Sequence, residues 1–357
     1  MRPESLDFLK AIVNAPSPSG YEERAAKVYR DYTTFADEQR TDSHGNVFAI
    51  LNPKAATRIM LSGHLDEIGF IVKYISDDGL VYFARVGGHD TMIAVGQHVW
   101  VHGKTRVAGV IGRKPIHLMS SDDRTKVPEF SDLWIDVGAT SKSEAMEQIS
   151  LGDVVTYTAE FRHLMGDRAA ARGFDNKVGA FIVAEALRHL KEDGGLHTDV
   201  GVYATGTVQE EIGIRGAATA SFSIDAKTGI AVDVSFSTDY PNVPKEKWGD
   251  AYVGKGPLVT RGANINHVAF GILQKAAEED GIPYQVEVEG GRSGTDAEAM
   301  QISRGGMATG LIGVPIRYMH TPCELLSLTD VENCAKLMAA YCRRITPETD
   351  FTPRIVE

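Results

Sequence analysis

Apolar, β-branched segments alternate with helical segments along most of this chain, and this alternation is the strongest constraint on its fold. Strand patterns occur at 46–51, 58–63, 199–209, 230–234 and 309–314, and helix patterns at 176–190 and 330–345. Strands that alternate with helices form a mostly parallel sheet with helices on both faces. The sequence therefore predicts a doubly wound α/β domain, whose ligands would collect beyond the carboxyl ends of the strands.

Residues 70–165 have a different pattern. Short alternating runs such as FIVKYI, HVWVHG and RVAGVIG are separated by turns that contain Gly or Asp. This pattern is typical of a small all-β unit. We therefore expect a discontinuous α/β domain, 1–69 plus 166–357, with a small barrel-like β domain inserted at 70–165.

Two residue pairs have the spacing of a helix capping box. Ser19 with Glu22 predicts the start of a second helix, and Thr329 with Glu332 predicts the start of the closing helix. In both cases the first side chain would accept a hydrogen bond from the first turn of the helix.

Composition excludes several classes of protein. The 357 residues include 48 acids and 37 bases, and a net charge of −11 argues against a nucleic-acid partner, which needs a basic footprint. There is no apolar run of about 18 residues, so no membrane span is expected. The N-terminal MRPESLDFLKAIV lacks a signal-peptide pattern, and the cysteines lack metal-site or disulfide spacing. We predict a soluble, cytoplasmic protein.

The stretch VYATGTVQEEIGIRGA, residues 202–217, places Glu210 and Glu211 side by side at the end of an apolar strand. In a regular strand these two side chains would face opposite ways. If the chain leaves the extended conformation there, both carboxylates can enter one site. One would then bind a metal and the other would act as a general base.

Histidines and carboxylates follow other predicted strands in the same way. RIMLSGHLDEIGF ends a strand at His64 and Asp66, IAVDV contains Asp233, and His320 follows GLIGV. Asp175 precedes the helix at 176–190. Imidazole nitrogens and carboxylate oxygens are ligands for zinc and similar ions, and together these residues suffice for two divalent metals.

The ordered motifs GHLDEIGF, FDNKVGA, TVQEEIGIRGA, AVDVSFSTDYP and YMHTPCE resemble those of the M42 family of dinuclear metalloaminopeptidases. That family includes glutamyl and deblocking aminopeptidases and TET peptidases, and the resemblance covers essentially the whole chain. It implies an aminopeptidase that hydrolyses N-terminal residues from peptides with a free N-terminus. It also implies two zinc or cobalt ions per subunit and dimers that assemble into a tetrahedral dodecamer, with the inserted domain serving oligomerisation and access.

The resemblance assigns a role to each candidate residue. The implied metal ligands are His64, Asp175, Glu211, Asp233 and His320. Asp175 would bridge the two metals, Glu210 would be the general base, and Asp66 would orient the site as a further catalytic residue. The bond Asp175–Asn176 is expected to be cis, and Lys177 replaces the arginine of many members.

Other functions stay open at this point. A related metal-dependent deacylase or carboxypeptidase would use the same scaffold but prefer N-blocked substrates or free C-termini. A non-catalytic, shell-forming protein would have a degenerate site, whereas every expected ligand and the base are present. No substrate-binding residue is assigned. Arg292 and Thr295 lie in a loop that resembles one near the substrate pocket of relatives.

Overall fold

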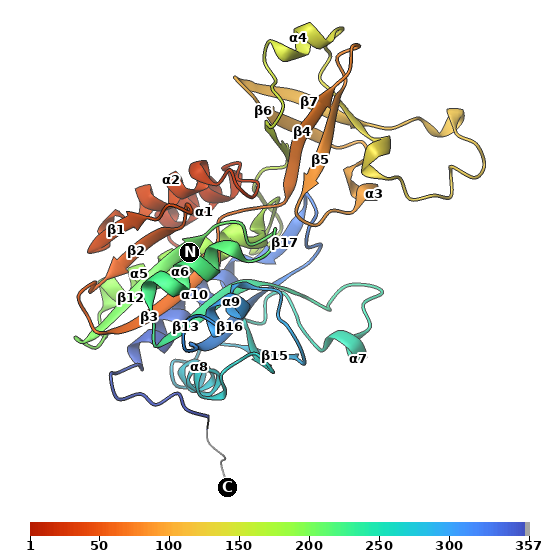
Figure 1. Cartoon of the computed structure of the whole chain (residues 1–357). Helices are drawn as coiled ribbons and strands as arrows, with labels where there is room; N and C mark the ends of the chain where they lie inside the picture. Colours follow the sequence, from red (N-terminus) through yellow and green to blue (C-terminus); the bar gives the residue numbers. More distant parts are fainter. Residues whose placement is uncertain (354–357) are drawn as a thin grey trace.

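An eight-stranded sheet is the centre of the computed structural model, which describes residues 1–353 (Figure 1). The strand order is β1-β2-β12-β3-β13-β16-β14-β15. In that order the strands are Glu38–Thr41, Val47–Leu51, Val200–Thr207, Thr57–His64, Thr228–Phe236, Ala308–Ile316, Leu258–Gly262 and Gln285–Glu289. The four strands from β12 to β16 are parallel, so their carboxyl ends meet at one edge of the sheet. This arrangement confirms the predicted fold class.

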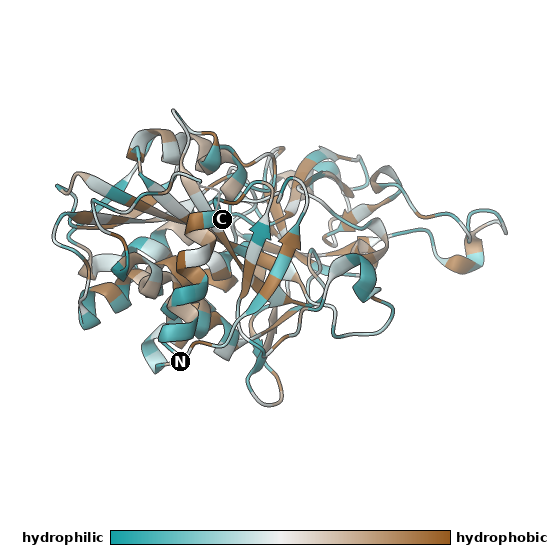
Figure 2. Cartoon of the chain, turned by 90° about the horizontal axis from the view of Figure 1, so that it is seen from below, coloured by the Kyte–Doolittle hydropathy of each residue, from teal (hydrophilic) through white to brown (hydrophobic). Residues whose placement is uncertain are grey.

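Helices cover both faces of the sheet. One face packs against α2 (Glu23–Tyr32), α5 (Phe174–Asp193), α8 (His267–Glu279) and α10 (Leu328–Arg343), and α1 (Pro3–Asn14) packs against α2 and α5. The other face packs against α6 (Arg215–Ile224) and α9 (Asp296–Gln301). Figure 2 shows hydrophobic residues concentrated in the strands between these helices. Within residues 1–353, none of the helices has the length and apolar character needed to cross a membrane.

The sheet and α5 approach each other closely at two glycines. A Cβ added to Gly63 of β3 would lie only 2.3 Å from the backbone carbon of Gly179. This contact is possible only because residue 63 has no side chain. It brings the end of β3 next to the start of α5.

A closed six-stranded barrel forms a separate lobe (Figure 1). Its strands are Gly69–Ile75 (β4), Val81–Val86 (β5), His98–His102 (β6), Arg106–Gly112 (β7), Trp134–Asp136 (β8) and Val154–Tyr157 (β9). The barrel has its own hydrophobic core, and the short helices α3 (Thr91–Ala94) and α4 (Lys142–Met146) lie beside it. A second, three-stranded sheet joins β10 (Arg162–His163) and β11 (Arg168–Ala171) to β17 (Glu324–Ser327). The remaining helix, α7 (Lys245–Trp248), lies in the connection between β13 and β14.

The helices at both predicted capping boxes exist, but their caps differ from the prediction. The Ser19 hydroxyl donates to Asp66 Oδ2 at 2.7 Å, and α2 begins after Glu22 without a side-chain cap. At α10 the cap is Ser327, whose hydroxyl accepts a hydrogen bond from Asp330 N at 3.2 Å. The predicted caps at Ser19 and Thr329 are therefore wrong, and Ser19 takes a tertiary partner instead.

Candidate metal centre

Five side chains with nitrogen or oxygen donor atoms meet at the carboxyl edge of the parallel strands. We call these residues the metal centre: His64, Asp175, Glu211, Asp233 and His320. His64 ends β3, Asp233 lies in β13, and Asp175 lies at the start of α5. Glu211 and His320 lie in the connections that follow β12 and β16. The fold thus brings together all the residues that the motifs indicate as ligands.

The metal centre divides into two groups that share Asp175. In the first, His64 Nε2 lies 3.4 Å from Asp175 Oδ1 and 3.9 Å from Asp233 Oδ1. In the second, His320 Nε2 lies 3.1 Å from Asp175 Oδ2 and 3.6 Å from Glu211 Oε2. The ligand atoms of each group lie within 4.8 Å of one another, close enough to hold one metal ion. The two oxygens of Asp175 face different groups, as a bridging ligand requires.

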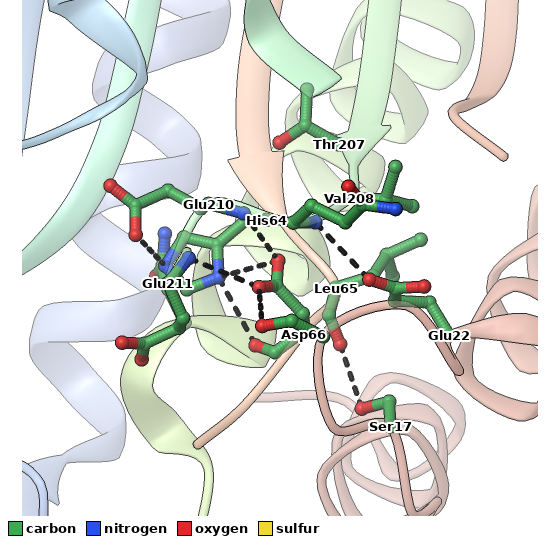
Figure 3. Close-up of polar contacts among 12 residues, drawn as sticks. Ser17, Glu22, His64, Leu65, Asp66, Thr207, Val208, Glu210 and Glu211 are labelled. Carbon is green, nitrogen blue, oxygen red and sulfur yellow. Dashed lines mark hydrogen bonds and ion pairs between the residues drawn. The ribbon is translucent and has the colours of Figure 1, made fainter. Parts of the chain in front are cut away.

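The neighbouring glutamates reach the site because the strand ends before them. β12 ends at Thr207, and Gln209 has a left-handed φ of 57°. The backbone N–H groups of Glu210 and Glu211 then donate to the Asp66 carboxylate at 3.0 and 3.1 Å (Figure 3). Both glutamate side chains line the same cavity. The chain therefore leaves the extended conformation where the sequence indicates.

Asp66 connects the glutamate pair to the first group of ligands. Its Oδ1 lies 3.3 Å from His64 Nδ1 (Figure 3), whereas Asp175 lies beside the other ring nitrogen, Nε2. A carboxylate in this position fixes the orientation of an imidazole ligand. Glu210 belongs to neither group, although its Oε2 lies 3.8 Å from His64 Nε2.

The charges of the site favour a bound cation. Burial and the nearby Asp175 raise the pKa of Glu211 well above its ordinary value, and burial raises that of Asp233 in the same way. Burial raises the pKa of Glu210 to about 9. Burial acts to lower the pKa of His64, but the hydrogen bonds with Asp175 and Asp66 and the nearby negative charges together outweigh it and raise this pKa well above the ordinary value. Glu211 Oε1 is buried and has no hydrogen-bond partner within residues 1–353. Metal ions therefore suit this set of donors.

Buried groups outside the metal centre hold its backbone in place. The Asp175–Asn176 peptide bond is cis, as the resemblance implies. Glu324 is buried, and its two carboxylate oxygens accept hydrogen bonds from Asp175 N and His320 N, each at 3.0 Å. Glu324 belongs to the YMHTPCE motif, but the sequence alone does not reveal that it connects two ligands.

Lys177, which replaces the arginine of many family members, is buried close to the start of α5. Lys177 is fully buried, and its Nζ donates to Glu67 Oε1 at 2.9 Å and to the Ala15 carbonyl at 2.8 Å. The same carboxylate pairs with Arg172. Lys177 therefore contributes to a buried ion cluster and leaves the ligand positions unchanged.

A cavity of about 860 Å³ opens from the metal centre along the sheet. The residues that line it beyond the metal centre include Ser235, Leu258, Thr260 and Glu287. Thr295 also lines the cavity and accepts a hydrogen bond from Ala297 N as the cap of α9. Arg292 is exposed and pairs with Glu298, so the two residues of this loop have different surroundings.

The protein-family model described as M42 glutamyl aminopeptidase matches residues 45–337. The chain belongs to the M42 family. This M42 enzyme is 36% identical to a lysyl aminopeptidase of Pyrococcus furiosus, over 97% of this chain and 99% of that protein. A TET aminopeptidase from the marine sediment archaeon Thaumarchaeota archaeon SCGC AB-539-E09 has a similar structure, with a TM-score of 0.91, 33% identity and 97% coverage of both chains.

The TET1 peptidase of Pyrococcus horikoshii, whose assembly into a tetrahedron or an octahedral shell has been described, is also similar. It has a TM-score of 0.84 and 32% identity over 96% of this chain and 100% of that chain. Membership of the M42 family confirms the predicted enzyme class, a peptide hydrolase that acts at N-termini.

Proposed function

We propose that this M42 enzyme is a metal-dependent aminopeptidase with two divalent ions, zinc or cobalt, in its metal centre. The observation that carries this proposal is the pair of ligand groups that share Asp175. His64 and Asp233 would complete the first metal site, and Glu211 and His320 the second. When bound, two such ions lower the pKa of a shared water and polarise the scissile carbonyl.

Glu210 is the group best placed to act as general base. Its carboxylate lines the cavity beside the metal centre but belongs to neither ligand group. Burial raises its pKa to about 9, so positive charge in the site would be needed to make it an acceptor at neutral pH. In this role Glu210 takes a proton from the attacking water and returns it to the leaving amine. Asp66 would hold His64 and the backbone of Glu210 in position.

The charge of the cavity supports a substrate with a free N-terminus. With two divalent ions bound, the cavity would hold five positive charges, because Lys247 is its only Lys or Arg within residues 1–353. Seven carboxylates line it, so negative charge remains in excess and attracts an α-ammonium group. They are Asp175, Glu210, Glu211, Asp233, Asp250, Glu287 and Glu289. A carboxypeptidase would need a cation to hold the C-terminal carboxylate, and the only Lys or Arg lining the described cavity is Lys247. A deacylase would accept a substrate whose amino group is acylated and uncharged, so this excess of negative charge would not attract that end of the substrate.

We extend the proposal to assembly and location. The likeness to TET peptidases, which include a dodecamer and a tetrahedral assembly, supports a homo-oligomer, and we propose a tetrahedral dodecamer built from dimers. We assign 1–69 and 166–357 to the catalytic domain, and 70–165 to a domain that serves oligomerisation and access. Cys323, Cys334 and Cys342 are free, which fits a reducing cytoplasm.

Replacing Glu210 tests the chemistry. Glu210→Gln should retain about the wild-type content of zinc or cobalt, measured by elemental analysis, because Glu210 is not a ligand. It should hydrolyse leucyl-p-nitroanilide about 10²–10⁴ times more slowly, the usual contribution of a general base. Glu144→Gln, in exposed helix α4 of the barrel, is the matched control and should behave as wild type. Wild-type activity in Glu210→Gln would refute the assignment, and faster hydrolysis of acetylated amino acids than of p-nitroanilides would favour the deacylase.

A further inference from the structure

The cavity contains a carboxylate that the proposed chemistry does not use, that of Glu287 on β15. Ser235 Oγ donates a hydrogen bond to Glu287 Oε1, and Thr260 Oγ1 donates to Oε2 at 3.2 Å. A Cβ added to Gly313 would lie 3.5 Å from the same Oε2. The carboxylate therefore lies over the sheet, held by hydroxyl groups of β13 and β14.

A hydrogen bond to β13 shows which part of the sheet this carboxylate reaches. In the register Glu287 pairs with Thr260, two strands away from β13. Its side chain nevertheless reaches Ser235, which lies two residues after Asp233 on β13, about 6.6 Å along the strand. Glu287 and the metal centre line the same cavity, so one ligand can have an end at each.

Glu287 has hydroxyl donors but no counter-charge. Within residues 1–353, no Lys or Arg forms an ion pair with it. Lys247 lines the same cavity, but its Nζ lies over the Trp248 ring, 4.5 Å from the ring centroid. Burial raises the pKa of Glu287. A carboxyl group withdrawn from water in this way is stabilised as an anion when a cation comes beside it.

We propose that Glu287 binds the cationic side chain of the substrate's N-terminal residue, so that the enzyme prefers lysine or arginine at that position. The inference rests on the proposed aminopeptidase function, which places the substrate's α-ammonium group at the metal centre. Leu258 and Leu311 line the cavity and would pack against the aliphatic stem of such a side chain. An N-terminal glutamate would instead bring its carboxylate towards Glu287, so acidic residues are the poorest substrates.

The test compares four p-nitroanilides, those of lysine, arginine, leucine and glutamate, on the enzyme loaded with zinc or cobalt. Wild type should show the highest kcat/KM with lysine and arginine and the lowest with glutamate. Glu287→Gln retains the shape of the side chain but removes its charge. It should lose at least about tenfold in kcat/KM for the lysine and arginine substrates, because a charge-assisted contact is lost, and change by less than about threefold for leucine.

Glu289→Gln is the matched control, because Glu289 lies on the same face of β15, two residues further along, and lines the same cavity. It should retain most of the preference for basic residues. A wild-type preference for leucine or glutamate would overturn the proposal, as would an equal loss for lysine and leucine in Glu287→Gln or an equal effect of both variants. If none of the four substrates is hydrolysed, the aminopeptidase function itself is wrong, and the role of Glu287 is wrong with it.

Discussion

Replacing Gly63 by alanine should force β3 and α5 apart and disturb the metal centre at the end of β3. The new methyl group would lie 2.3 Å from the backbone carbon of Gly179 and 2.6 Å from its carbonyl oxygen. Both atoms belong to the main chain of a buried helix, so no side chain can rotate away. Relief requires a movement of about 1 Å between the strand and the helix, because ordinary contacts between carbon atoms begin near 3.5 Å.

Two magnitudes follow from this movement. Overpacking of a buried contact lowers the free energy of unfolding by about 1–3 kcal/mol. We expect about 3 kcal/mol for Gly63→Ala, because the atoms that the new methyl group meets belong to the main chain and cannot rotate away. The same movement acts on the 3.4 Å separation between His64 Nε2 and Asp175 Oδ1, which belong to the two elements that move. A displacement of about 1 Å at a catalytic centre lowers activity by about 10²-fold.

Urea unfolding followed by far-ultraviolet circular dichroism measures the first effect, and kcat/KM with a p-nitroanilide measures the second. Gly271→Ala is the control, because a Cβ at Gly271 in α8 meets no atom within 4 Å. Removing a glycine from the interior of a helix should stabilise that variant by about 0.5–1 kcal/mol. If Gly63→Ala unfolds at the wild-type urea concentration and retains full activity, the close contact does not position the ligands.

Three further outcomes are expected. In Glu324→Gln the side chain can accept only one of the two hydrogen bonds from Asp175 N and His320 N. The affinity of this variant for zinc, measured by calorimetry, should therefore fall about 10–100-fold. Unchanged affinity would contradict the role of Glu324 in positioning Asp175 and His320. Removing metal with a chelator should abolish activity and lower the unfolding temperature. The second effect follows because a ligand at 100 times its Kd stabilises the native state by about 2.7 kcal/mol. An unfolding temperature that is insensitive to the chelator would argue against a bound metal. Burial opposes ionisation of Glu185, but the hydrogen bonds from Arg188, Tyr32 and Ser5 together with the charge of Arg188 outweigh it and lower the pKa of Glu185 below the ordinary 4.5. Its contribution to stability is therefore present above about pH 4.5 and lost as the pH falls through the lowered pKa of the folded state. Glu185→Gln should thus be less stable than wild type by about 1–3 kcal/mol at pH 7, and this difference should shrink at pH 3, as urea unfolding at both pH values would show.

Much of the metal centre could be predicted because its ligands interrupt apolar strands. Asp233 lies within a buried run where an unpaired carboxylate is costly, and His64 ends another such run. The rule that ligands collect at the carboxyl ends of parallel strands then indicates where these side chains meet. The pair Glu210 and Glu211 also points to a break in the strand, which occurs at Gln209.

Residues whose partners are distant in the sequence could not be predicted. Ser19 and Glu22 have the spacing of a capping box, but the Ser19 hydroxyl donates to Asp66, which no local pattern indicates. The QVEVE segment of β15 alternates acidic and apolar residues, a pattern that fits an exposed edge strand as well as a cavity wall. The position of Glu287 depends on reaching Ser235 across two intervening strands, which follows only from the sheet order.

The wide separation of the ligands along the chain has a consequence for biosynthesis. His64 is available early, but the second group is completed only by His320, and β16 must first join the sheet beside β13. A nascent chain that has not yet emerged beyond residue 320 therefore lacks one of the five side chains of the metal centre. Because translation proceeds from the N-terminus, the proposed hydrolytic activity would arise only when synthesis is nearly complete.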